Sequence, residues 1–167
     1  MSEGLRKELI ALLPRLRRFA RTLTGSTHDA DDLVQDVCLK ALNNSESWDP
    51  TQPLDRWVFR IMRNHWVSEI RKRKVRFGEG QVLAEEANEL VQKETAEDTL
   101  RGAQLRRQVE ELPAELAVLL LAVSVEGYSY AEAAETFDIP IGTVMSRIHR
   151  ARKTLAAQLN QQSGEAP

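Results

Sequence analysis

The sequence, 167 residues long, lacks most features that mark secreted, membrane-spanning or metal-binding proteins. It has a single cysteine, Cys38, so no internal disulfide can form, and the scattered His28, His65 and His149 give no metal-ligand spacing. The longest apolar run, residues 116–123, is far shorter than the roughly 20 residues that a membrane span needs. No signal peptide is visible at the N-terminus. We therefore expect a cytoplasmic protein without membrane insertion.

Groupings that could perform catalysis are missing as well. The sequence contains no Ser-His-Asp grouping, no glycine-rich phosphate-binding loop and no cluster of metal ligands. Its hydrophobic content of 42% is nevertheless sufficient to build cores of modest size. The sequence therefore predicts a globular protein that is not an enzyme and that holds no metal or other cofactor.

Charge is abundant but unevenly distributed. From Arg56 to Arg76 there are eight Arg or Lys against one Glu, a net charge of +7, in a chain whose total is −2. Residues 77–100 carry seven Asp or Glu against a lone Lys, a net charge of −6. The basic stretch predicts a surface for a polyanion such as nucleic acid. The acidic stretch has no strong apolar period and predicts a flexible linker.

Apolar residues recur at helical spacing on both sides of this linker, and strand-type alternation is absent. The pattern predicts an all-α fold in which two small helical domains are joined by the flexible acidic linker. The predicted helices are Leu5–Thr24, Asp29–Asn43 and Leu54–Lys74 before the linker, and Ala96–Glu111, Ala114–Val125, Tyr130–Phe137 and Thr143–Gln161 after it.

The basic helix, Leu54–Lys74, has two opposed faces. One is a mostly apolar stripe that we expect to be buried, and the other gathers cations. Within the stripe, Trp57 and His65 are interpreted as packed side chains. Trp66 lies off the stripe, where packing against the first helix and stacking on an unpaired base both fit. The stripe consists of Leu54, Trp57, Val58, Ile61 and His65, and the cationic face of Arg60, Arg63, Arg71 and Lys74.

The C-terminal part contains the cues of a helix-turn-helix motif. Ser129 and Glu132 form an S-x-x-E capping box, and Asp138 occupies a turn position that tolerates the left-handed conformation. In the next helix one face is apolar and the other is polar and basic, which suits a DNA major groove. A surface helix with solvated charges is the alternative. The apolar face consists of Val144, Ile148, Ala151 and Leu155, and the outer residues are Thr143, Ser146, Arg147, His149, Arg150 and Lys153.

The second predicted helix, Asp29–Asn43, carries a leucine among acidic and amide groups on its outer side. One apolar anchor with a polar rim indicates a protein-docking site. A single exposed leucine is also ordinary, so this pattern alone leaves both interpretations open. The outer residues are Asp32, Gln35, Asp36 and Leu39, and the predicted buried face consists of Leu33, Val34, Val37, Cys38, Ala41 and Leu42.

Three segments resemble bacterial sigma factors of the extracytoplasmic-function (ECF) class in the sigma-70 family. They are LTGSTHDADDLVQDVCLKAL, PLDRWVFRIMRNHWVSEIRKRK and EGYSYAEAAETFDIPIGTVMSRIHRARKTL. The resemblance spans nearly the whole chain and places the family's two conserved regions in the expected order. It implies region 2 over residues 1–76, the acidic linker over 77–98, region 4 over 99–161 and a disordered tail over 162–167.

The resemblance also implies partners and residue roles. The protein would bind core RNA polymerase, direct it to promoter DNA, and be restrained by an anti-sigma factor. Asp32, Gln35, Asp36 and Leu39 would dock on the polymerase. The loop 47–53 and the basic helix would meet the minus-ten element, with Arg60, Arg63, Asn64 and Arg71 as contacts. Thr143, Ser146, Arg147, His149 and Arg150 would read the minus-thirty-five element.

Two other classes of function remain in view. A sigma-like decoy would sequester an anti-sigma protein without contacting DNA, and we expect such a protein to lose the basic residues of both DNA faces; here they are retained. A conventional helix-turn-helix repressor or activator would need a ligand pocket or a self-complementary interface. The amino-terminal helices instead end in a basic surface.

Overall fold

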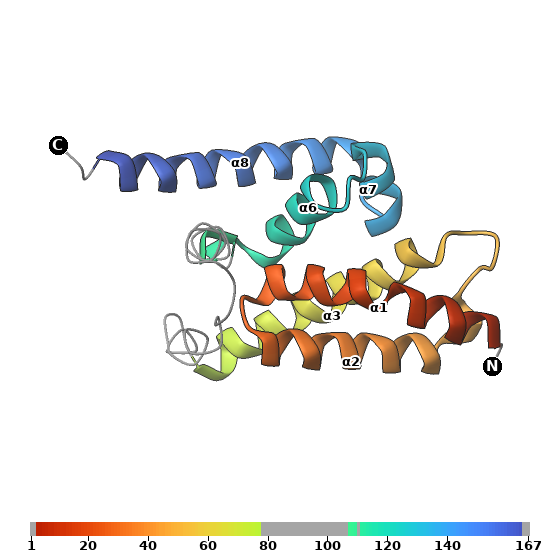
Figure 1. Cartoon of the computed structure of the whole chain (residues 1–167). Coiled ribbons are helices and arrows are strands. Elements are labelled where there is room, and N and C mark those ends of the chain that lie inside the picture. Colours follow the sequence, from red (N-terminus) through yellow and green to blue (C-terminus); the bar gives the residue numbers. More distant parts are fainter. Residues whose placement is uncertain (1–2, 78–106, 110, 165–167) are drawn as a thin grey trace. The chain divides into compact units, whose positions relative to one another are not determined.

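The computed structural model describes residues 3–77, 107–109 and 111–164, which form helices without any strand (Figure 1). The chain divides into two units, Met1–Lys93 and Glu94–Pro167. The all-α prediction is therefore confirmed. The predicted linker, residues 77–98, lies outside the described residues except for Phe77, which ends a helix.

The first unit contains helices α1 (Glu3–Thr24), α2 (Thr27–Asn43) and α3 (Leu54–Phe77), with a short 3-10 turn, η1 (Ser45–Ser47), after α2. Each helix packs on the other two. All three lie where the apolar spacing predicts them, and their ends differ from the prediction by at most three residues.

A two-residue connection separates α1 from α2. Gly25 adopts a φ of 72°, a left-handed conformation that glycine reaches without steric cost. The Ser26 side chain then caps α2 by accepting a hydrogen bond of 3.2 Å from the backbone N–H of Asp29. This tight connection holds α2 against α1.

The core of the first unit differs from the predicted stripe on α3. Leu54 and Val58 are buried as expected, but the other buried residues of α3 are Phe59, Met62, Trp66 and Val67. The Phe59 ring packs edge-on against Phe19 of α1, with ring centroids 4.9 Å apart. The stripe is rotated because α3 carries apolar side chains around much of its circumference, and packing against both α1 and α2 selects the buried ones. The predicted stripe members Trp57, Ile61 and His65 lie at its half-buried edge.

The structure distinguishes the two tryptophans of α3. Trp66 is only 7% exposed, and the Arg73 guanidinium lies 5.3 Å from its ring centre, so Trp66 is not open for base stacking. Trp57, predicted to be in the core, is half-buried and lies 6.5 Å from the ring of Trp48. Packing thus decides the alternatives for Trp66, and it corrects the prediction for Trp57.

The second unit contains α6 (Ala114–Ser124), α7 (Tyr130–Phe137) and α8 (Ile141–Gly164), which pack on one another. Helix α8 begins two residues before the predicted Thr143 and runs three residues into the predicted tail. Residues 107–109 and 111 are helical, as predicted, and the rest of the helix expected over 96–111 lies outside the described residues.

The helix-turn-helix cues are present as predicted. The Ser129 side chain accepts a hydrogen bond of 3.0 Å from the backbone N–H of Glu132, whose carboxylate accepts one of 3.2 Å from the backbone N–H of Ser129. Asp138 ends α7 with φ 53° and ψ 52°, in the left-handed region. Val144, Ile148 and Ala151 are buried, whereas Leu155 is half-buried because α8, with 24 residues, extends beyond α6 and α7.

Removing the capping box should destabilise the second unit. We expect Ser129→Ala to lower the free energy of unfolding by about 0.5–2 kcal/mol, because the backbone N–H of Glu132 in the first turn of α7 loses its acceptor. Chemical denaturation of the full chain, followed by circular dichroism, measures the change. Ser124→Ala is the matched control, since Ser124 is exposed at the end of α6. Equal stability of the two variants would contradict a role for the cap.

Among the described residues, none of the helices has both the length and the apolar character needed to cross a lipid bilayer.

Candidate nucleic-acid and protein interfaces

The outer side of α2 presents the four side chains that the sequence singled out. Asp32, Gln35, Asp36 and Leu39 are all exposed, and Leu39 is 52% exposed. Leu33, Val34 and Val37 are buried on the other side of the helix. These residues form the buried face of α2 without Leu39, so packing of the core does not explain why an apolar residue stands at this position. We call Asp32, Gln35, Asp36 and Leu39 the docking surface.

Two histidines lie beside carboxylates of the docking surface, and the sequence analysis did not pair them. His65 Nε2 of α3 lies 3.2 Å from Asp36 Oδ2, and His28 Nε2 lies 3.5 Å from Asp32 Oδ2. The second pair is spaced i, i+4 on α2, a signal that the sequence does contain. The first pair joins two helices, so only the packing of α3 on α2 reveals it.

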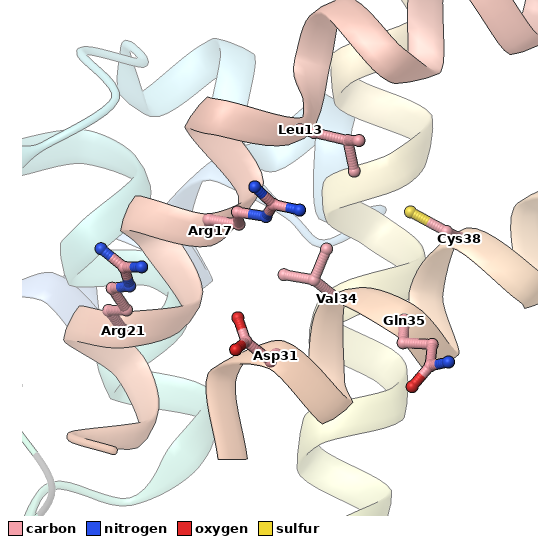
Figure 2. A pocket seen from close by; sticks show the side chains of 7 residues that line it. All are labelled: Leu13, Arg17, Arg21, Asp31, Val34, Gln35 and Cys38. Atoms are coloured by element: carbon pink, nitrogen blue, oxygen red, sulfur yellow. The ribbon is translucent and has the colours of Figure 1, made fainter. Parts of the chain in front are cut away.

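A groove of about 540 Å³ runs between α1 and α2 beside the docking surface. Figure 2 shows the side chains of both helices that face it, with Arg17 and Arg21 on α1 and Asp31 and Gln35 on α2. Gln35 belongs both to this groove and to the docking surface.

Cys38 also lines this groove and is half-buried, rather than a fully packed core residue as predicted. Burial raises the pKa of the Cys38 thiol, and the Arg17 guanidinium offsets part of this rise. Leu42, predicted to be buried, is half-buried as well. Both residues lie at the edge of the buried face of α2. The buried face is therefore narrower than the apolar pattern predicts.

The candidate minus-ten residues lie along α3. Arg60 and Arg63 are half-buried, whereas Asn64 and Arg71 are exposed. The structure brings Arg63 and Asn64 together, because Arg63 Nη1 donates a hydrogen bond of 2.9 Å to Asn64 Oδ1. A guanidinium and an amide held side by side can offer several donors to a phosphate or a base edge.

The loop before α3 is ordered by its own polar side chains. Asp49 Oδ1 accepts hydrogen bonds from the Thr51 backbone N–H at 2.9 Å and from the Thr51 hydroxyl at 2.7 Å. These hydrogen bonds hold the pKa of Asp49 below its usual value. Trp48, at the start of this loop, packs at a tilt of 31° to Trp57 of α3. The loop and the first turn of α3 therefore form one aromatic corner, which the sequence analysis did not identify.

The candidate minus-thirty-five residues on α8 divide into two groups. Ser146, His149 and Arg150 are exposed. Thr143 and Arg147 are half-buried, and Arg147 Nη2 lies 3.7 Å from Glu115 of α6. Ser146, His149 and Arg150 are thus accessible on the polar face of α8, whereas the Arg147 side chain is held against α6.

A side-chain contact also joins α7 and α8, the two helices of the motif. Arg152 Nη1 of α8 donates a hydrogen bond of 3.4 Å to the Tyr130 hydroxyl of α7. Together with the packing of Val144 and Ile148, it fixes α8 relative to α7, as a helix-turn-helix motif requires.

Comparison with known families matches both units. The family model of sigma-70 region 2 matches residues 9–76, and that of sigma-70 region 4 matches residues 102–155. The ECF RNA polymerase sigma factor EcfG of Rhodopseudomonas palustris is 35% identical over 159 residues, which cover 95% of this chain and 87% of that protein.

Solved structures agree. The sigma factor RpoE of Bartonella quintana, crystallised with the anti-sigma factor NepR, matches with a TM-score of 0.75 and 31% identity, covering 95% of this chain and 98% of that one. The anti-anti-sigma factor PhyR of the same organism, complexed with NepR, matches with a TM-score of 0.65 over 92% of this chain and 50% of PhyR. At 16% identity, the PhyR match shows a shared fold alone. Family models, relatives and fold therefore agree that this chain belongs to the ECF class of sigma-70 family RNA polymerase sigma factors.

Proposed function

We propose that the protein binds core RNA polymerase through the docking surface of α2 and directs it to promoters through α3 and α8. The observation that carries this proposal is the match to an ECF sigma factor over 95% of the chain, with the arginines of both candidate DNA helices retained. In this proposal the polymerase performs the synthesis and the chain itself performs no chemistry.

The polymerase contact is assigned to α2 because its exposed side combines an apolar anchor with a polar rim. Leu39 supplies the anchor, and Asp32 and Asp36 offer carboxylates to cations of the partner. These side chains lie on a helix whose opposite face is fixed in the core, so the surface is presented on a rigid element.

The minus-ten contact is assigned to α3 and the loop before it. The helix from Arg56 to Arg76 carries a net charge of +7, which suits the phosphate backbone. Arg60, Arg63, Asn64 and Arg71 are the proposed contacts. We assign the aromatic corner of Trp48 and Trp57, at the start of α3, to contact with an unpaired base of the opened duplex.

The minus-thirty-five contact is assigned to α8, the second helix of the helix-turn-helix motif. Ser146, His149 and Arg150 are exposed on it and would reach base edges or phosphates in the major groove. Thr143 and Arg147 are assigned to the flank of this surface. Because the Glu115 carboxylate holds the Arg147 guanidinium, we expect Arg147 to contact the DNA phosphate backbone rather than the bases.

Arg150→Ala tests the assignment of α8. If Arg150 donates two hydrogen bonds to a guanine, its loss should cost about 1–3 kcal/mol of binding, and the cost should depend on the minus-thirty-five sequence. Holoenzyme binding to a promoter and to single-base variants of it measures this dependence. The matched control is Arg18→Ala, because Arg18 is exposed on α1 and belongs to neither DNA surface. Equal losses on all templates would make Arg150 a phosphate contact.

We also propose that an anti-sigma factor restrains the protein. Support comes from RpoE of Bartonella quintana, which is 31% identical over 95% of this chain and was solved in complex with the anti-sigma factor NepR. A partner of this kind would block the docking surface or the DNA helices.

A sigma-like decoy is the alternative, and it predicts a different surface. A protein that only sequesters an anti-sigma factor has no use for the arginines of α3 and α8. Both sets are retained, which favours the promoter-binding role. Co-purification with core RNA polymerase, followed by footprinting of the complex on promoter DNA, separates the two. The proposal requires protection of both promoter elements, and a decoy would leave DNA unprotected.

A further inference from the structure

One side chain of α3 reaches the docking surface of α2. His65 Nε2 lies 3.2 Å from Asp36 Oδ2, a distance at which a ring N–H can donate a hydrogen bond to a carboxylate. The His65 side chain is 11% exposed, whereas the Asp36 side chain is 51% exposed. The nearly buried His65 of α3 therefore holds one oxygen of the exposed Asp36 carboxylate on α2.

This contact does not serve stability well. The other ring nitrogen, His65 Nδ1, is buried and has no hydrogen-bond partner among the described residues. Burying an unpaired polar nitrogen costs free energy that an apolar side chain would not incur. Asp36 is half-open to water and does not need His65 to be solvated. The arrangement is better explained by what His65 does to Asp36 than by what it adds to the core.

What His65 does to Asp36 is to restrict its orientation. An ionised carboxylate has about four lone-pair sites, so one contact with His65 leaves the outer oxygen free to accept from a partner. A side chain that is already ordered loses less entropy when it binds. The contact therefore orients the Asp36 carboxylate for binding to the polymerase and leaves its second oxygen able to accept a hydrogen bond.

We propose that His65 is a positioning residue for core RNA polymerase binding, acting through Asp36. This inference rests on the proposed docking role of α2. It also gives α3 a second task, because the helix that is proposed to meet the minus-ten element helps to shape the polymerase contact as well.

The pair of His28 and Asp32 provides an internal control. It joins the same two residue types at 3.5 Å, but the side chains are 75% and 60% exposed. Exposed pairs of this kind restrict little and contribute little. His28→Leu should therefore leave the affinity for core polymerase unchanged, although it removes a contact to the docking surface.

The test is a double-mutant cycle with full-length chains and core RNA polymerase, comparing His65→Leu, Asp36→Ala and the double variant by their dissociation constants. We expect His65→Leu to weaken binding about two- to tenfold, the effect of freeing one ordered side chain. In the Asp36→Ala background, which has no acceptor for His65, the same change should have much less effect. His65→Gln, whose amide can still donate to Asp36, should restore most of the affinity.

Thermal unfolding distinguishes positioning from a structural role. His65→Leu should leave the midpoint unchanged or raise it while it weakens binding. Additive effects in the cycle, or a His65→Gln variant as weak as His65→Leu, would overturn the positioning role alone. If Asp36→Ala bound core polymerase normally, the positioning role and the docking assignment of Asp36 would both be wrong.

Discussion

Leu39→Asp should abolish detectable binding to core RNA polymerase. Leu39 is the apolar centre of the docking surface, and an aspartate there would bury an unpaired charge at the interface. We expect a loss of at least about 2 kcal/mol, or about 30-fold in the dissociation constant. Size-exclusion chromatography and fluorescence anisotropy with labelled protein measure the loss directly.

The fold should survive this change, because Leu39 is 52% exposed and its helix is anchored by Leu33, Val34 and Val37. Circular dichroism and thermal unfolding check this. The matched control is Ile10→Asp, which places the same charge on an aliphatic residue of α1 that is 65% exposed. Normal core binding by Leu39→Asp would refute the docking assignment, and loss of binding by both variants would remove its specificity.

The affinity of the holoenzyme for promoter DNA should fall steeply as the salt concentration rises. The arginines of α3 should account for a defined part of the slope of log affinity against log salt concentration. Each phosphate contact contributes about 0.9 to the slope of log affinity against log salt concentration. Replacing Arg60, Arg63 and Arg71 with Gln should therefore reduce the slope by about 2.7, if all three contact phosphates. A slope of that size corresponds to about 40-fold in affinity between 50 and 200 mM salt.

Titration of promoter binding at several salt concentrations gives both slopes. Arg18→Gln should leave the slope unchanged, since Arg18 is exposed on α1 and belongs to neither DNA surface. A triple variant with the slope of the parent protein would mean that α3 does not track the phosphate backbone. The polymerase contributes its own DNA contacts, so the difference between the slopes, rather than either slope alone, tests the assignment.

Helical periodicity predicted the positions of the helices well, because each helix pairs a wide apolar face with clear start and stop signals. The capping box of Ser129 and the left-handed Asp138 were readable from residue types, since each has a local cause within four residues. The exposed position of Leu39 was also predicted from the helical wheel of α2, because other apolar residues of this helix supply its buried face.

The errors arose where tertiary packing chooses among several apolar side chains. On α3 the sequence offers Trp57, Ile61 and Trp66 in different directions, and contact with α1 and α2 selects Trp66. The pairing of His65 with Asp36 and that of Arg147 with Glu115 each join two helices. No local spacing encodes such contacts, so sequence analysis could identify the residues but not their partners.

Run-off transcription with purified core RNA polymerase shows whether the protein directs initiation at specific promoters. A library of genomic fragments is transcribed by core polymerase alone, with the protein, and with a variant in which Arg60, Arg63, Arg71 and Arg150 are replaced by Gln. We predict discrete transcripts that require the protein and disappear with the variant. Transcript patterns that are the same with and without the protein, or that are unchanged in the variant, would contradict the account.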